Sequence, residues 1–332
     1  MSEQFDFIAL GDIVNDEFIQ LDTDQARVFK NEAGELRISM SFGNKIPYCG
    51  AVVVNAVGNS PNAAVAAHRL GLKSALITDI GDDEEGRLTL AALAREGVDQ
   101  SFVDVHGGKE TNHHYVIRYG AERTILIRHE AYEYVMPDVG SPKWIYFSSV
   151  GEDSMQYHHD IAAYVKERPE TKLAFQPGSF QIKLGYEKLK DIYEVCELFF
   201  CNREEAMQIL KTEDRDIVGL LNGMQGLGVS RPIITDGPAG AYVKDGEDIW
   251  HMPMYPDPAP PVDRTGAGDS FSSTFTSCLA LGMSVPEALA RGPINSMSVV
   301  QYIGAQEGLL SMEKLEEFLA QAPADYVAKK IN

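Results

Sequence analysis

From Trp144 onward, short apolar segments alternate with segments of helical periodicity. Strands are expected at 144–149, 172–176, 198–201 and 231–236, and helices at 155–166, 186–193, 285–303 and 311–320. Parallel strands need long crossover connections, which are usually helices. The alternation therefore predicts an α/β fold with a mostly parallel sheet covered by helices on both faces.

The chain begins with a predicted strand, the apolar run Phe5–Leu10, which ends at Gly11-Asp12. Ligands collect at the carboxyl ends of strands in open α/β sheets. Asp12 and Asn15 are therefore candidates for binding substrate hydroxyls. The alternative is that both are turn residues with no further role, because Asp and Asn are common in turns.

The sequence Gly58-Asn59-Ser60-Pro61-Asn62 predicts the start of a helix. Ser60 is a favourable N-cap, and Pro61 is a favourable first helical residue. Asn62 then lies in the first turn, where its side chain could reach a ligand. Gly71 is expected to end this helix.

Two segments of the first half depart from the strand–helix alternation. Residues 17–57 and 110–130 contain short apolar runs separated by polar turns, including an expected hairpin of His113–Tyr119 and Thr124–His129. They predict antiparallel ribbons. The chain has no repeat, low-complexity tract or clear linker, so residues 1–332 are expected to form a single domain with these two segments as a β lid. Arg118 and Arg128 of the hairpin fit either an anionic substrate or an exposed, charged strand face.

The segment Asp263-Arg264-Thr265-Gly266-Ala267-Gly268-Asp269 lies between a proline-rich loop and a helical pattern. N–H groups in the first turn of a helix lack intrahelical partners, and the helix dipole adds partial positive charge. Glycines let an anion approach such backbone closely, so the segment is suited to phosphate. Asp269 would repel a bound phosphate, but it could take a proton from a hydroxyl that attacks the phosphate. The alternative is a glycine-rich turn with an ordinary first-turn acid.

Two further motifs stand at the ends of predicted strands. Asn202-x-x-Glu205 fits either a helix cap or a magnesium site, because Mg²⁺ keeps several waters and needs only one or two protein oxygen groups. The segment from Thr235 to Gly240 fits either a turn between strands or a backbone surface for a nucleotide. The chain contains neither the P-loop sequence nor the dinucleotide-binding G-x-G-x-x-G.

Composition argues against several function classes. The formal charge of −20 disfavours nucleic acid or an anionic membrane as a partner. No segment has the length of a transmembrane helix, Met1–Leu10 lacks the basic region of a signal peptide, and the four cysteines show no metal-ligand spacing. A cytoplasmic protein is therefore expected. The pairs His113-His114 and His158-His159 are expected to be solvent-facing or packed rather than metal-binding.

In their order along the chain, these motifs resemble the PfkB (ribokinase-like) family of carbohydrate and nucleoside kinases. The resemblance covers nearly the whole chain and rests on Gly11-Asp12, Gly58–Asn62, the loop from Gly81 to Gly86, Asn202-x-x-Glu205, Thr235-x-Gly237-Pro238-x-Gly240 and Asp263–Asp269. It implies a three-layer αβα fold and phosphoryl transfer from ATP to a hydroxyl of a small sugar. A nucleoside kinase of the same family is the alternative. A non-catalytic sugar- or nucleotide-sensing protein is a third reading, but it has no need of an acid at position 269.

The resemblance also implies roles for individual residues. Asp269 would be the general base, and N–H groups of Gly266, Ala267 and Gly268 would form an anion hole. Asn202 and Glu205 would organise Mg²⁺ through water. The ATP site would be lined by Thr235, Gly237 and Gly240, with Asn295 near the adenine. The acceptor would be held by Asp12, Asn15, Gly58 and Asn62. Asp263 and Thr265 match positions that in several members help to bind a monovalent cation, such as K⁺. Exposed edges of the lid would need a cover, which implies a homodimer through the β lid.

Three positions depart from the family pattern. Asn59 stands where many members have glycine, Asp236 is acidic beside the expected phosphate path, and Arg264 adds a cation next to the expected anion hole. These departures leave the identity of the acceptor open.

Overall fold

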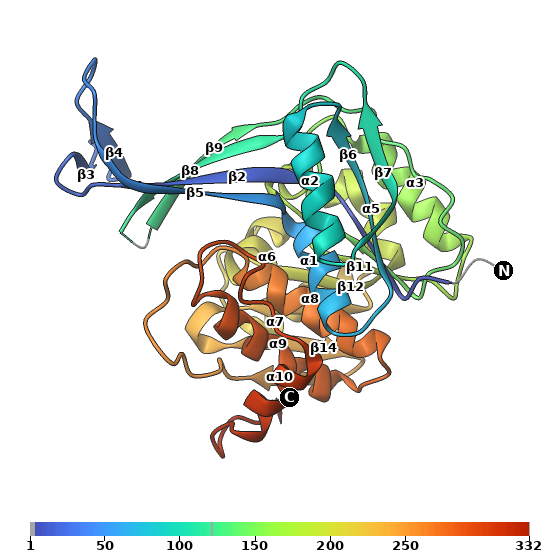
Figure 1. Ribbon diagram of the computed structural model, residues 1–332. Helices are drawn as coiled ribbons and strands as arrows, with labels where there is room; N and C mark the ends of the chain where they lie inside the picture. Colours follow the sequence, from blue (N-terminus) through green and yellow to red (C-terminus); the bar gives the residue numbers. More distant parts are fainter. Residues whose placement is uncertain (1–3, 121, 332) are drawn as a thin grey trace.

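A ten-stranded sheet forms the middle layer of the protein (Figure 1). The computed structural model describes residues 4–120 and 122–331. The strand order is β16-β15-β14-β13-β12-β11-β10-β1-β6-β7. Strands β7, β6, β1, β10, β11, β12 and β13 run parallel, whereas β14, β15 and β16 pair antiparallel. The strands are β1 (Phe7–Leu10), β6 (Ser74–Gly81), β7 (Asp99–His106), β10 (Trp144–Phe147), β11 (Lys172–Phe175), β12 (Cys196–Asn202), β13 (Arg231–Thr235), β14 (Ala241–Asp245), β15 (Asp248–Met252) and β16 (Lys329–Lys330).

Helices cover both faces of this sheet, which confirms the predicted three-layer fold (Figure 1). Alternate residues of β1 face opposite layers, with Phe7 and Ala9 in one core and Ile8 and Leu10 in the other. Helices α1, α2, α8, α9 and α10 contribute to the first core, and α3 to α7 contribute to the second. The helices are α1 (Asn59–Arg69), α2 (Glu84–Arg95), α3 (Met155–Lys166), α4 (Ser179–Leu184), α5 (Tyr186–Val195), α6 (Arg203–Leu210), α7 (Ile217–Gly226), α8 (Ala267–Ala280), α9 (Val285–Val299) and α10 (Met312–Ala320), with a 3-10 turn, η1, at Gly237–Ala239. Among the described residues, no helix is both long and apolar enough to cross a membrane.

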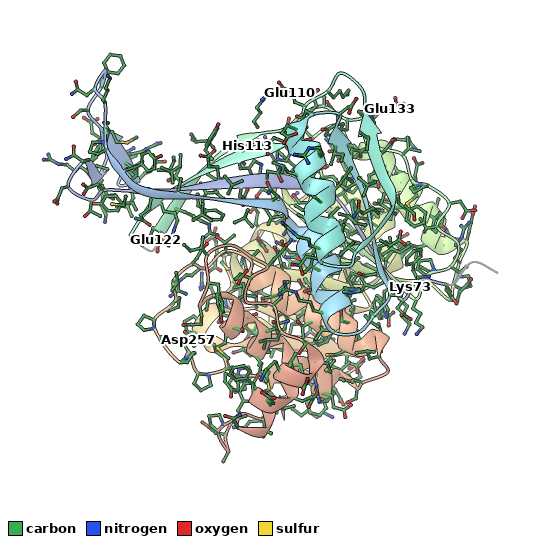
Figure 2. All side chains as sticks on the ribbon, viewed as in Figure 1. Lys73, Glu110, His113, Glu122, Glu133 and Asp257 are labelled. Atoms are coloured by element: carbon green, nitrogen blue, oxygen red, sulfur yellow. The ribbon has the colours of Figure 1, made fainter. Side chains whose placement is uncertain are left out.

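A four-stranded sheet, here called the lid sheet, projects from one side of the domain (Figure 1). Its order is β5-β2-β8-β9, with bounds β5 (Tyr48–Val57), β2 (Val14–Leu21), β8 (His113–Tyr119) and β9 (Glu122–Arg128). A hairpin of β3 (Ala26–Lys30) and β4 (Leu36–Met40) lies at its far end. Figure 2 marks His113 and Glu122 on this sheet.

The predicted hairpin in the lid sheet is confirmed by antiparallel pairing of β8 with β9. Residue 121 of its turn lies outside the described residues. Within residues 17–57, β2 pairs antiparallel with β5 and β3 with β4, as expected, and the two segments join through parallel pairing of β2 with β8. Arg118 is buried and donates to the backbone carbonyl of Val262 at 2.9 Å, while the exposed Arg128 forms an ion pair with Glu110.

Several predicted boundaries need correction. Ser60 does not cap α1, because the helix begins at Asn59, two residues earlier than expected, with Gly58 as its N-cap. The hydroxyl of Ser60 instead donates to the carbonyl of Leu10 at 2.6 Å, which ties α1 to the end of β1. The helix expected to reach residue 303 ends at Val299. No prediction covered β7, α4, α7 or β16.

Helix α8 is the element on which the site depends, and its central anchor is Phe275, which is fully buried. We expect Phe275→Ala to lower the free energy of unfolding by about 3–5 kcal/mol, because the truncation removes buried apolar surface and leaves a cavity. The matched control is Phe42→Ala, since Phe42 is fully exposed at 102% and should contribute within about 0.5 kcal/mol. Urea denaturation of both variants checks this, and equal losses would contradict the packing described.

Candidate active site

The site is built where α8 begins. Gly266 precedes the helix with a φ of 80°, a conformation that L side chains rarely adopt. A Cβ at this position would lie 2.3 Å from the Cβ of Ala305, so the close approach also requires glycine. Ala267 and Gly268 follow in the first turn, where N–H groups lack intrahelical acceptors. This turn therefore offers N–H groups and the positive end of the helix dipole.

The carboxylate of Asp269 is partly buried in the same turn and accepts hydrogen bonds from side-chain amides. Asn59 donates at 3.0 Å and Asn62 at 2.8 Å, both from the start of α1. Gln176, which follows β11, donates at 3.0 Å. Burial raises the pKa of Asp269, while these amides and the charge of Arg123 lower it. The site therefore holds a desolvated carboxylate in a fixed direction, as a general base requires.

Asn59 and Gln176 were not among the predicted site residues. Asn59 is the position that departs from glycine, and the departure places an additional donor on Asp269. Gln176 is held by Tyr146 and Ser272, whose hydroxyls donate to its Oε1 and leave its NH₂ group facing Asp269. Its position just after a buried strand is the same signal that identified Asp12.

Asp12 follows β1 and is buried. Its Oδ1 accepts a hydrogen bond from the hydroxyl of Tyr134 at 2.9 Å, and its Oδ2 has no hydrogen-bond partner among the described residues. Burial and the neighbouring Asp12 carboxylate raise the pKa of Tyr134, which keeps this phenol a donor. Gly58 has a φ of 126°, and a Cβ there would lie 2.8 Å from the carbonyl oxygen of Asp12. Gly58 therefore allows the start of α1 to approach the Asp12 loop.

Asn15 lies on the lid strand β2 and is fully buried. Its Nδ2 donates to the carboxylate of Glu85 at 2.8 Å, and its Oδ1 accepts from the N–H of Ala56 at 2.9 Å and the hydroxyl of Thr89 at 3.0 Å. Both ends of this amide are therefore hydrogen-bonded within the protein, where the lid sheet meets α2.

Two adjoining cavities meet at α8, and Thr235, Gly268 and Phe271 line both. The first, of about 310 Å³, extends from Asn59 and Gln176 to Asn202 and Glu205. The second, of about 200 Å³, is bounded by Gly237 and Gly240 on one side and by α9 on the other. The expected phosphate-binding turn, magnesium residues and nucleotide-binding turn thus border one continuous region.

Asn202 and Glu205 form the helix cap that the sequence allowed. Oδ1 of Asn202 accepts from the N–H of Glu205 at 2.8 Å, and Oε2 of Glu205 accepts from the N–H of Asn202 at 2.8 Å. Burial raises the pKa of Glu205. Both residues also line the larger cavity, so the cap does not remove them from it. Their oxygen groups are of the type that Mg²⁺ prefers, directly or through water.

The acidic residue beside the expected phosphate path is neutralised within the protein. Asp236 forms an ion pair with Arg203 at 2.5 Å, and both side chains are largely buried. Arg203 follows Asn202 at the end of β12, which pairs with β13. The negative charge of Asp236 is therefore offset by a cation from the end of the neighbouring strand. Arg264 lines the smaller cavity beside Ala267.

Asn295 is the predicted nucleotide residue that the structure does not bring to a cavity. It is fully buried, its Nδ2 donates to Thr274 at 2.8 Å, and its Oδ1 accepts from the N–H of Leu310 at 2.9 Å. The next residues of α9, Ser296 and Met297, line the smaller cavity instead. Asn295 therefore joins α8 to the segment after α9.

Asp263 and Thr265 lie in the loop before Gly266. The carboxylate of Asp263 is buried and accepts from the hydroxyl of Thr265 at 2.7 Å, from the N–H of Thr265 at 3.0 Å and from the N–H of Gly304 at 3.0 Å. These contacts fix the loop that leads into Gly266.

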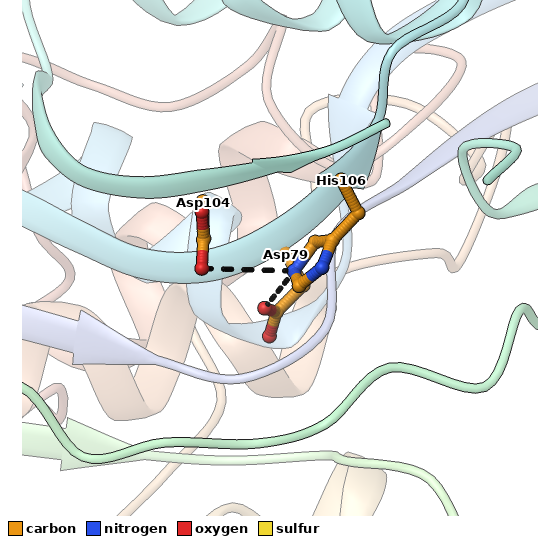
Figure 3. A group of neighbouring side chains, drawn as sticks. All are labelled: Asp79, Asp104 and His106. Atoms are coloured by element: carbon orange, nitrogen blue, oxygen red, sulfur yellow. Dashed lines mark hydrogen bonds and ion pairs between the residues drawn. The ribbon is translucent and has the colours of Figure 1, made fainter. Parts of the chain in front are cut away.

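A group of Asp79, Asp104 and His106 lies on β6 and β7 (Figure 3). Nε2 of His106 lies 2.7 Å from Asp79 and 3.8 Å from Asp104, whose side chain is 75% exposed. Burial raises the pKa of Asp79, while its hydrogen bond to His106 lowers it. The group is a histidine paired with one carboxylate at a sheet edge. Of the histidines expected to be packed, His158 is fully buried and contacts the carbonyl of Ser154 at 2.6 Å.

Comparisons with known proteins place these features in a family. The model of the pfkB family of carbohydrate kinases matches residues 31–312. An uncharacterized sugar kinase of Archaeoglobus fulgidus is 28% identical over 73% of this chain and 96% of its own. Fructoselysine 6-kinase of Escherichia coli is 27% identical over 75% of this chain and 90% of its own.

Solved structures agree in fold. Arabidopsis thaliana ribokinase, complexed with ribose and ATP, superposes with a TM-score of 0.78 at 18% identity, covering 96% of this chain and 99% of that one. An E. coli protein described as a ribokinase II, in complex with ATP and Mg²⁺, superposes with a TM-score of 0.73 at 18% identity, covering 96% and 99%. At this identity the likeness concerns the fold alone.

The match to the family model covers most of the chain and includes the loop from Asp263 to Asp269. The chain therefore belongs to the pfkB family of carbohydrate kinases, and it is a phosphotransferase with an alcohol group as acceptor.

Proposed function

We propose that this protein transfers the γ-phosphoryl group of ATP to a hydroxyl of a small sugar, with Asp269 as the general base. The observation that carries the proposal is the place of Asp269 in the first turn of α8, partly buried, held by three amides and next to the residues that line both cavities. A protein that only binds a sugar or a nucleotide has no need of a desolvated carboxylate beside a phosphate-binding turn. The name of the E. coli relative and the ribose in the Arabidopsis structure support a sugar as acceptor.

In this mechanism the acceptor hydroxyl lies beside Asp269. Asp269 takes the proton as the hydroxyl oxygen attacks the γ-phosphorus and the bond to the bridging oxygen of ADP breaks. N–H groups of Gly266, Ala267 and Gly268 donate to the phosphoryl oxygens and stabilise the charge that develops on them. Asn62 orients the base from the start of α1.

The other parts of the site follow the cavities. Asn202 and Glu205 would hold Mg²⁺ through water, and the bound ion supplies positive charge to the phosphates. Thr235, Gly237 and Gly240 line the smaller cavity as the ATP site, with Ser296 and Met297 on its far wall. K⁺ beside the loop of Asp263 and Thr265 is a further part of the proposal, because this loop leads directly into Gly266.

Asp12, Asn62 and Gly58 form the acceptor side. The unpartnered Oδ2 of Asp12 is available to a sugar hydroxyl, and Gly58 lets α1 approach Asp12 closely. Asn15 shapes this side through its bonds to Glu85 and Thr89. An ADP-release assay with ATP and a panel of ribose, fructose, fructoselysine and adenosine tests the proposal. Turnover of adenosine far above that of the sugars would replace the sugar kinase by a nucleoside kinase.

We expect Asp269→Asn to lower kcat by about 10²–10⁴-fold, because the variant keeps the shape of the side chain and loses the base. KM for ATP should stay equal or fall, since a negative charge near the phosphates is removed. The control is Asp216→Asn, an exposed N-cap of α7 at which asparagine also caps well, and it should leave kcat unchanged. The measurement is steady-state kinetics together with the melting temperature, and a kcat for Asp269→Asn within a few-fold of the parent would exclude Asp269 as the base.

The lid sheet also supports a proposal about assembly. The strand register places Val53, Tyr115 and Leu126 in one row with Glu17, and these three apolar side chains are 51%, 45% and 55% exposed. Both edge strands of the lid sheet, β5 and β9, have mostly exposed residues. Exposed apolar surface with free strand edges is typical of an interface, and the same surface of a second copy would complement it. We infer a homodimer through the lid sheet.

Light scattering after gel filtration tests this inference. The parent should have about twice the chain mass of 36.6 kDa, and Leu126→Glu should shift it toward the monomer, because a charge replaces an apolar side chain in the interface. The matched control is Leu281→Glu, since Leu281 is 43% exposed at the end of α8 and lies outside the lid sheet. A parent protein that is monomeric at micromolar concentration would contradict the dimer.

A further inference from the structure

Four side chains form a continuous chain of contacts between the lid sheet and the body, and the proposed mechanism uses only one of them. Oδ2 of Asp12 lies 3.4 Å from Nδ1 of His129. Nε2 of His129 lies 2.9 Å from Nε2 of His114, and the two rings are stacked at 5.1 Å. Nδ1 of His114 lies 3.3 Å from Oδ1 of Asp16. The order is therefore Asp12, His129, His114, Asp16, with one imidazole contact in the middle and a carboxylate at each end.

Three atoms of this chain are buried without a hydrogen-bond partner among the described residues. They are Oδ2 of Asp12, Nδ1 of His129 and Oδ1 of Asp16. A buried polar atom without a partner destabilises the protein, so such atoms need a ligand or water. Oδ2 of Asp12 and Nδ1 of His129 face each other, and Asp12 lies on the proposed acceptor side. One acceptor hydroxyl could satisfy both atoms by donating to the carboxylate and accepting from the imidazole N–H.

The protein holds this pair in place from both sides. Asn112 is buried; its Nδ2 donates to the carbonyl of Ile13 at 3.1 Å, and its Oδ1 accepts from the N–H of Glu130 at 2.8 Å. It therefore fixes the residue after Asp12 relative to the residue after His129. Tyr134 donates to the other oxygen of Asp12 and accepts from the N–H of Gly151 at 2.9 Å. The unpartnered atoms thus belong to a built arrangement.

The contact between the two imidazoles decides which nitrogens carry protons. A hydrogen bond between Nε2 atoms holds one proton, so one ring donates and the other accepts. If His114 donates, His129 accepts at Nε2 and carries its own proton at Nδ1, facing Asp12. His114 then needs a second proton at Nδ1, because a lone pair there would face the carboxylate of Asp16. The arrangement that satisfies every contact is an imidazolium at His114, stabilised by Asp16, and a neutral His129 with Nδ1–H.

We propose that His129 is an acceptor-binding residue whose Nδ1–H donates to the same substrate hydroxyl that Asp12 accepts, and that Asp16 and His114 are positioning residues that fix its tautomer. The proposal rests on the proposed function for the identity of the ligand as an acceptor. It gives the lid sheet a direct part in binding, since His114 lies on β8, Asp16 lies on β2 and His129 follows β9. A ligand with an oxygen that both donates and accepts a hydrogen bond fits the pair, as a sugar hydroxyl does.

The proposal predicts a pH dependence of acceptor binding. When rising pH removes one proton from the pair and the hydrogen bond between the rings is kept, a lone pair must face either Asp16 or Asp12, and the second choice removes the N–H donor from the acceptor. KM for the acceptor should therefore rise with pH. The other titratable groups around the pair are Glu130, Tyr132 and Tyr134 from the segment after β9 and Asp79 from β6, whose carboxylate is electrostatically coupled to Asp12. On the opposite face of β8, His113 lies 3.8 Å from both Glu17 and Glu85.

Nitrogen-15 NMR of the histidine rings in the full-length protein without ligand tests the tautomers directly. We expect His129 to show a protonated Nδ1 and an accepting Nε2 at pH 6, and His114 to be doubly protonated. Asp16→Asn should change the protonation of both rings together, because it removes the charge that faces Nδ1 of His114. Two rings that titrate independently, or His129 with its proton at Nε2, would overturn the proposal.

Kinetics supply the second readout, with the panel sugar that has the highest turnover. His129→Leu should raise KM for that sugar by about 10–100-fold, because the buried carboxylate of Asp12 loses the companion donor, while KM for ATP stays constant. His129→Asn should recover much of the affinity through its NH₂ group and abolish the pH dependence. The control is His159→Asn, which alters a histidine 2.5 Å from Asp191 on the α3–α5 side of the sheet and should change neither KM.

The outcomes separate this proposal from the proposed function. If ATP-dependent turnover occurs but His129→Leu leaves KM for the sugar unchanged, the assignment of His129 is overturned and the kinase mechanism stands. If no member of the panel is phosphorylated, the proposed function loses its support, and the NMR transitions alone decide whether Asp16 and His114 set the tautomer of His129.

Discussion

The partly buried carboxylate of Asp269 is the constraint on which the rest of the site depends. Burial disfavours the charged form and raises the pKa of this group. Because the folded-state pKa is raised, the group stabilises the fold most at low pH, and that stability is lost as the pH rises through the folded-state pKa. A protein that needs the ionised form must therefore supply hydrogen-bond donors. The amides of Asn59, Asn62 and Gln176 do this without adding a charge that would compete for a phosphate.

These amides are themselves held by other parts of the chain. Gln306 donates to Oδ1 of Asn62 at 3.0 Å and to the carbonyl of Ala56 at 2.8 Å, which joins the segment after α9 to α1 and the end of β5. Tyr146 and Ser272 orient Gln176 from β10 and α8. One carboxylate is thus connected to the body, to the lid sheet through β5, and to the C-terminal third of the chain. Such a network is satisfied only when all of these elements are in place, so it favours one arrangement of the fold.

Much of this arrangement could be predicted from the sequence, because its causes are local. Alternating apolar and helical segments predict the parallel sheet, and parallel strands bring their carboxyl ends to one edge, where Asp12 and the loop after β12 lie. Glycines before Asp269 predict a helix start suited to an anion. Contacts between elements could not be predicted, because they have a tertiary cause. Asn15 and Asn295 have suitable side chains in suitable segments, and the structure shows that the amides of both bond to neighbouring elements.

The residues that sequence reasoning missed are those defined by contacts across the fold. Asn59 acts on Asp269 only because α1 packs against α8. His129 meets His114 only because β8 and β9 pair in a particular register, and it meets Asp12 only because the lid sheet adjoins β1. A histidine 117 positions after its aspartate gives no periodic signal, since the relation arises from strand pairing and not from spacing within one element. Sequence patterns find the ends of elements, whereas packing decides which polar side chains are left available.

The pH dependence of kcat at saturating ATP and sugar tests the central claim most directly. Asp269 accepts a proton only when ionised, and burial raises its pKa above the ordinary aspartate value of 3.8. The account predicts that log kcat falls with a slope of about one on the acid side, with a midpoint above that ordinary value, and that Asp269→Asn abolishes this limb. A kcat that stays constant down to the ordinary aspartate range, or an acid limb that persists in the asparagine variant, would contradict the assignment of Asp269 as the base.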